Sequence, residues 1–78
     1  MNQERVKIVE SLKERHKIYL GIKEEEIRRD PYWVINKPLK GEYLKEWTEY
    51  GINLIMSTLK VDRVKAEVEM SWIQASYI

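Results

Sequence analysis

Apolar side chains recur at helical spacing in the first twenty residues of the chain. The residues that form this pattern are Val6, Val9, Leu12, Tyr19 and Leu20, with Ile8 beside them. Asn2 is a candidate N-cap, and Gly21 follows at a position where helices commonly end. The pattern predicts a long helix over residues 4–20.

A second, shorter helix is predicted over residues 22–29. Its acidic residues come first and its arginines last, which is the order that the helix dipole favours. Glu24 with Arg28 and Glu25 with Arg29 are acid-first pairs four residues apart. Pro31 ends the segment, because the residue before a proline avoids the α conformation.

A short apolar run follows at residues 32–36. It begins Tyr32-Trp33-Val34-Ile35 and is bounded by Pro31 on one side and Pro38 on the other. Aromatic and β-branched residues between such breakers are typical of a strand, so we expect a short strand or extended segment here.

The longest helical pattern covers residues 41–59. Its apolar stripe is widened by Tyr43, Tyr50 and Ile55, and its spacing of three and four residues is carried by Leu44, Trp47, Gly51, Leu54, Thr58 and Val61. A glycine inside a helix costs about 1 kcal/mol relative to alanine. Gly51 therefore predicts that another element approaches the helix closely at that point.

Residues 63–73 fit two different structures. Polar and apolar residues alternate strictly from Arg63 to Trp72, which favours a half-buried strand. The same segment is rich in the helix formers Lys, Ala, Glu and Met. As a helix it would carry two apolar faces, one containing Val64 and Val68 and the other Ala66 and Met70.

These elements predict an α+β fold within a single small domain, residues 1–78. It would contain two long helices, one short helix and two strands, at residues 32–36 and 63–73. The longer strand would leave an unpaired edge, which proteins normally cover or pair. We therefore expect a homodimer that completes the sheet, with an all-α helical dimer as the alternative.

The composition says more about where the protein works than about its function. The chain has no cysteine, 14 basic and 13 acidic residues, and no apolar run long enough to span a membrane. Without a signal-peptide pattern at the N-terminus, we expect a cytoplasmic protein with no membrane partner. Abundant Lys and Glu with few amides is a pattern reported for thermophilic proteins.

Groups suited to catalysis are scarce, so we expect no enzyme, no cofactor and no metal site. His16 is the single histidine, and we interpret it as a surface residue on a helix flank. Glu24, Glu25 and Glu26 lack the spacing of an EF-hand loop. No glycine-rich phosphate loop or serine nucleophile motif is present.

Nucleic-acid binding is the alternative function. Residues 1–40 hold ten basic and seven acidic residues, whereas residues 41–78 hold four and six. Two basic faces could contact phosphates, one over residues 5–17 and the other over residues 28–40. Their candidate residues are Arg5, Lys13, Lys17, Arg28, Arg29, Lys37 and Lys40.

The leading hypothesis is a small non-enzymatic binding or regulatory module that acts through protein–protein contacts, a common type among viral and mobile-element accessory proteins. Trp and Tyr anchor interfaces well, because each joins a large apolar area to one polar group. The candidate interaction residues are Tyr32, Trp33, Val64, Val68, Trp72 and Tyr77. A third hypothesis is a structural subunit that assembles into a larger particle.

Overall fold

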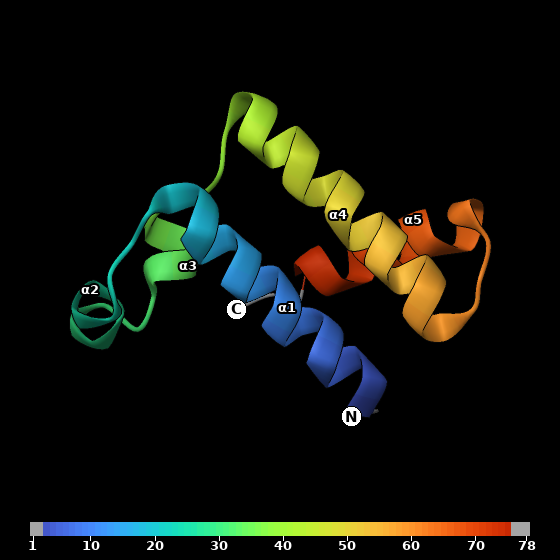
Figure 1. Ribbon diagram of the computed structural model, residues 1–78, viewed down its shortest axis with the longest axis horizontal. Coiled ribbons are helices and arrows are strands. Elements are labelled where there is room, and N and C mark those ends of the chain that lie inside the picture. Colours follow the sequence, from blue (N-terminus) through green and yellow to red (C-terminus); the bar gives the residue numbers. More distant parts are fainter. Residues whose placement is uncertain (1–2, 76–78) are drawn as a thin grey trace.

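The computed structural model describes residues 3–75 and shows a bundle of helices (Figure 1). The helices are α1 (Gln3–Leu20), α2 (Glu24–Arg29), α3 (Trp33–Asn36), α4 (Gly41–Leu59) and α5 (Arg63–Ala75). No strand occurs among residues 3–75, so the predicted α+β fold is wrong and the chain is all-helical. The helical part of the all-α alternative is confirmed.

The predicted helices at residues 4–20, 22–29 and 41–59 correspond to α1, α2 and α4. Gly21 has a φ of +64° directly after α1, a left-handed conformation that glycine adopts without strain. The predicted cap at Asn2 lies outside the described residues. Local periodicity and end signals were therefore sufficient to locate these helices.

The predicted strand at residues 32–36 is wrong, because this segment is the one-turn helix α3. Asp30 organises the turn that leads into it. Its Oδ1 accepts a hydrogen bond from the Tyr32 backbone N–H at 3.1 Å, and its Oδ2 accepts one from Asn36 Nδ2 at 2.9 Å. An aspartate bonded to the backbone two residues later stabilises a turn rather than an extended chain.

The predicted strand at residues 63–73 is also wrong, because these residues belong to α5. Asp62 caps the helix: its Oδ1 accepts the Lys65 backbone N–H at 2.9 Å. Arg63 then bonds Glu67, four residues later, at 3.0 Å. Polar and apolar residues do alternate here, but the Asp62 cap and the Arg63–Glu67 pair stabilise a helix. The helix also brings Ala66 and Met70 onto one face, which packs in the core.

The hydrophobic core lies where α4 packs against both α1 and α5. In Figure 1, α1 and α4 run in opposite directions. The core residues are Ile8, Leu12, Leu39, Trp47, Ile52, Ile55, Ala66, Met70 and Ile73. Trp47 also donates a hydrogen bond from Nε1 to the Leu12 carbonyl oxygen at 2.9 Å, so its polar atom is satisfied within the core.

The predicted close approach at Gly51 is confirmed. A Cβ built on Gly51 would lie 2.6 Å from Met70 Cε and 3.0 Å from Leu12 Cδ2. Gly51 thus allows α1 and α5 to reach the same part of α4. No helix in the described chain is both long and apolar enough to cross a membrane.

Candidate protein-interaction surface

The outer face of α5, defined by Val64, Val68 and Trp72, carries three large apolar side chains in solvent. Their exposed fractions are 74%, 53% and 69%, respectively. Residues four apart on a helix are neighbours on one side, so the three form a continuous row. Burying such side chains contributes about 1.5–3 kcal/mol each, which makes their exposure notable in a small domain.

The opposite side of α5 explains why this row faces outward. Ala66, Met70 and Ile73 are buried against the rest of the bundle. Successive helical residues are rotated by about 100°, so the alternating apolar residues separate into two faces. One face completes the core, and the domain offers nothing among residues 3–75 that covers the other.

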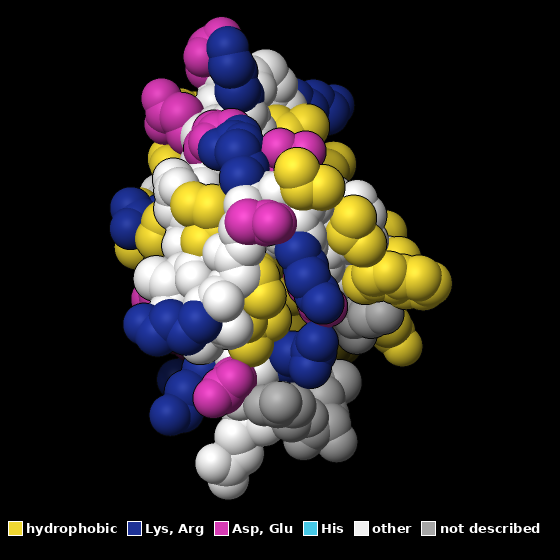
Figure 2. All heavy atoms as spheres, turned by 90° about the vertical axis from the view of Figure 1, so that its right-hand side faces the viewer, with side chains coloured by type: hydrophobic (Ala, Val, Ile, Leu, Met, Phe, Trp, Pro, Cys, Tyr) yellow, Lys and Arg dark blue, Asp and Glu magenta, His cyan; other side chains and the backbone are white. Residues whose placement is uncertain are grey.

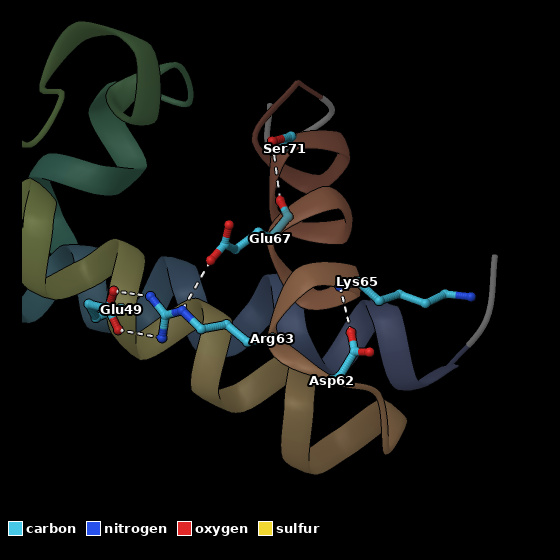
Figure 3. Close-up of polar contacts among 6 residues, drawn as sticks. All are labelled: Glu49, Asp62, Arg63, Lys65, Glu67 and Ser71. Atoms are coloured by element: carbon cyan, nitrogen blue, oxygen red, sulfur yellow. Dashed lines mark hydrogen bonds and ion pairs between the residues drawn. The ribbon is translucent and has the colours of Figure 1, made fainter.

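Polar contacts link the start of α5 to α4 at the surface (Figure 3). The Arg63 guanidinium bridges Glu49 on α4 and Glu67 on α5, with Nη1 3.1 Å from Glu49 Oε2 and Nε 3.0 Å from Glu67 Oε1. Hydrogen bonding to Arg63 lowers the pKa of Glu49, and the same contact raises the pKa of Arg63. Together with the buried side of α5, these contacts fix the position of the helix that carries the outer face.

The space-filling view agrees with an incompletely covered apolar surface. Figure 2 shows hydrophobic side chains that project from the right-hand edge of the molecule in that view. Further exposed apolar residues lie on other helices and loops, away from α5 in the sequence: Val6, Ile18, Tyr32, Ile35, Tyr43 and Leu44. None of these forms a row as regular as the outer face of α5.

The two aromatic residues predicted as one recognition surface have different environments. Tyr32 is 62% exposed, whereas Trp33 is only 6% exposed. Trp33 therefore belongs to the interior, and its prediction as an exposed contact residue is wrong. Tyr77, the last residue predicted for this role, lies outside the described residues.

His16 is buried, contrary to the predicted surface position. It is 3% exposed, and its ring lies 4.9 Å from that of Trp33 and 6.2 Å from that of Trp47. Its Nε2 is 2.8 Å from the Lys37 carbonyl oxygen, which requires Nε2 to carry the proton. Burial lowers the pKa of His16, although the hydrogen bond to Lys37 opposes this shift.

A pocket of about 290 Å³ opens beside this histidine. The pocket is lined by His16, Val34, Pro38, Leu39, Leu44, Trp47 and Gln74. Its walls are largely apolar, and no described group of acidic residues or histidines could hold a metal ion. The His16 cluster was not predicted, and the helical phase of His16 with Leu12 and Ile8 was the signal for its burial.

The basic residues predicted for nucleic-acid binding do not form one free cationic face. Arg5 pairs with Glu69 at 3.1 Å, and Lys37 pairs with Glu26 at 3.2 Å. Lys17 lies between Glu14 and Glu24, and hydrogen bonding to Glu24 raises its pKa. Lys13 also has an interaction within the chain.

The remaining candidates are exposed and lie outside these pairs. Arg28 and Arg29 are in the last turn of α2, and Lys40 precedes α4. None of the three makes an ion pair within 4.0 Å among residues 3–75, although the charge of Arg28 contributes to lowering the pKa of Glu24, four residues earlier. The structure thus divides the predicted basic residues into those held in close ion pairs and a smaller group that makes no ion pair within 4.0 Å.

Comparison with known proteins adds no functional information. No protein-family model matches the chain, and neither a curated protein nor a solved structure is similar to it.

Proposed function

We propose that this chain is a small non-enzymatic binding module that forms a homodimer through the outer face of α5. The observation that carries the proposal is that Val64, Val68 and Trp72 form an exposed apolar row along α5. Exposed apolar patches with polar surroundings are typical of protein–protein contact sites. Trp72 supplies the kind of aromatic anchor that dominates binding energy.

Self-association is the simplest way to cover this face. A chain of 78 residues removes only about 60% of its unfolded surface from water on folding. A second copy brings an identical apolar row without requiring any other partner. Dimerisation would then add to a small intrinsic stability, because binding to the folded state shifts the folding equilibrium.

The proposal is tested by measuring molar mass over a range of concentrations, by sedimentation or light scattering, for the native chain and for Val68→Asp. Val68 is half-exposed, so the monomer tolerates the carboxylate, but a dimer would bury its charge. We expect the native chain to be dimeric and Val68→Asp to be a folded monomer. The matched control is Asn53→Asp, which adds the same charge at an exposed position on α4.

Two results would contradict the proposal. A native chain that remains monomeric at the highest concentration would contradict the homodimer. A folded Val68→Asp variant with unchanged dimer mass would show that the dimer interface does not include the outer face of α5. Mass that grows beyond the dimer would instead favour a subunit of a larger assembly.

Nucleic-acid binding stays as a second candidate because Arg28, Arg29 and Lys40 are exposed without ion pairs. Fluorescence anisotropy with single- and double-stranded oligonucleotides at about 50 mM and 200 mM salt tests it. Binding that weakens steeply with salt, and that Arg28→Ala and Arg29→Ala reduce, would support it. Binding lost equally in Lys17→Ala would instead implicate the residues that are paired with glutamates here.

A further inference from the structure

We infer that the second copy lies antiparallel across the outer face of α5, with the two Val68 side chains at the twofold axis. This inference rests on the proposed homodimer and specifies its geometry. The row formed by Val64, Val68 and Trp72 repeats every four residues. Rows of this kind interdigitate at a crossing angle of about 50°, the commonest mode of helix packing in globular proteins.

The order of side-chain sizes along the row favours the antiparallel direction. A small residue, Val64, lies one turn before Val68, and a large one, Trp72, lies one turn after it. In an antiparallel pair centred on Val68, Val64 of each copy is level with Trp72 of the other copy. A small side chain therefore faces a large one at both ends of the contact. A parallel pair would set Trp72 against Trp72 and leave a gap between the two valines, which close packing disfavours.

Charge favours the same direction. Lys65 projects into solvent from the first turn of α5, and its side chain makes no ion pair within residues 3–75 (Figure 3). In the antiparallel pair, Lys65 comes within about 1.5 Å of the level of Trp72 of the second copy, measured along the helix axis. An ammonium group over an indole ring is a favourable cation–π arrangement. A parallel pair would place the two Lys65 residues level with each other.

The chain has no cysteine, so disulfide trapping can read the geometry directly. Each single-cysteine variant is first checked for dimer mass under reducing conditions and is then oxidised. Cysteines cross-link only when their Cα atoms lie within about 7 Å. The variants are Val64→Cys, Val68→Cys and Ser71→Cys, with Asn53→Cys on exposed α4 as the collision control.

We expect Val68→Cys to cross-link with itself and Val64→Cys alone not to, because its two copies would lie about 12 Å apart along the axis. An equal mixture of Val64→Cys and Ser71→Cys should give the mixed product, identified by intact mass. Ser71 is seven residues from Val64 on the same side of the helix and leaves Trp72 in place. Lys65→Ala should also weaken the dimer about two- to fivefold, with Lys45→Ala as the unaffected control.

Failure of this geometry is distinguishable from failure of the dimer. If the variants are dimers but Val64→Cys cross-links with itself and the mixture does not, the pair is parallel and the inference is overturned. If they are dimers and no α5 cysteine cross-links above the Asn53→Cys control, α5 is not the interface. If the reduced variants and the native chain are all monomers, the homodimer itself is overturned.

Discussion

His16 Nε2 donates a hydrogen bond to the Lys37 carbonyl oxygen at 2.8 Å, linking the last part of α1 to the loop that follows α3. The imidazole lies beside Trp33 and Trp47 in the interior. A buried group with no charge thus connects two segments that are 21 residues apart in sequence.

This contact predicts how stability depends on pH. Burial lowers the pKa of His16 in the folded state, so between the two pKa values the unfolded chain binds more protons. The stability that the neutral imidazole contributes is fully present above the pKa of histidine in the unfolded chain, about 6.5. This stability is lost as the pH falls below that value towards the pKa of the folded state. Urea midpoints at about pH 7.5 and 5.5 should therefore decrease in that order.

The control for this prediction is His16→Gln, which keeps a hydrogen-bond donor but does not titrate. The changed packing should lower its overall stability, but its urea midpoint should change less between the two pH values. An equal decrease in the native chain and the variant would show that other groups cause the pH dependence.

Gly51 and Met70 predict the effect of adding volume between α4 and α5. Gly51→Val should destabilise the protein by about 1–3 kcal/mol, because a Cβ would already meet Met70 Cε at 2.6 Å. Gly51→Ala should cost less, since the end of Met70 is flexible and alanine improves helix propensity by about 1 kcal/mol. Chemical denaturation of both variants measures the difference, and equal stability of the native chain and Gly51→Val would contradict the close contact.

Trp47 and Trp72 should respond differently to replacement by alanine. Trp47 is buried and bonded to Leu12, so Trp47→Ala should lower the free energy of unfolding by about 3–5 kcal/mol. Trp72 is largely exposed, so Trp72→Ala should retain the helical circular dichroism of the native chain and lose the dimer. A Trp72→Ala variant that unfolds at low concentration, where the native chain is folded and monomeric, would place Trp72 in the core.

Asp62 caps the start of α5, in the region for which the sequence predicted a strand, and its replacement should lower stability. Asp62→Ala removes the acceptor for the Lys65 backbone N–H and should destabilise the protein by about 0.5–2 kcal/mol. Asp62→Asn and Asp62→Ser should keep most of the stability, because both side chains cap helices well. Thermal or urea unfolding distinguishes these variants, and a neutral Asp62→Ala would show that the cap is dispensable.

Much of the helical structure was predictable because its signals are local. The spacing of Val6, Val9 and Leu12 and the glycine at position 21 indicated α1, and the apolar stripe indicated α4 with the same bounds as the structure. Gly51 also indicated a close contact before any neighbour was known. Each of these inferences depends on residues within a few turns of one another.

The errors arose where two local patterns competed. From Arg63 to Trp72 the apolar residues satisfy a period of two, but Asp62 and the Arg63–Glu67 pair also support a helix. The sequence interpretation favoured the strict alternation over the helix formers Lys, Ala, Glu and Met of the same segment. The candidate interaction residues Val64, Val68 and Trp72 nevertheless remain together, because spacing by four aligns them on a helix as spacing by two aligns them on a strand.

The sequence by itself determined the positions and ends of the long helices, since hydrogen bonds within a turn and local caps depend on nearby residues. The tertiary structure decided which face of α5 enters the core and which groups surround His16, whose helical phase with Ile8 and Leu12 already indicates burial. Both outcomes depend on where α1, α3, α4 and α5 meet in space. Burial is set by contacts between distant segments, such as His16 with Lys37 and Gly51 with Met70, and local periodicity carries no information about which distant surface a helix will cover.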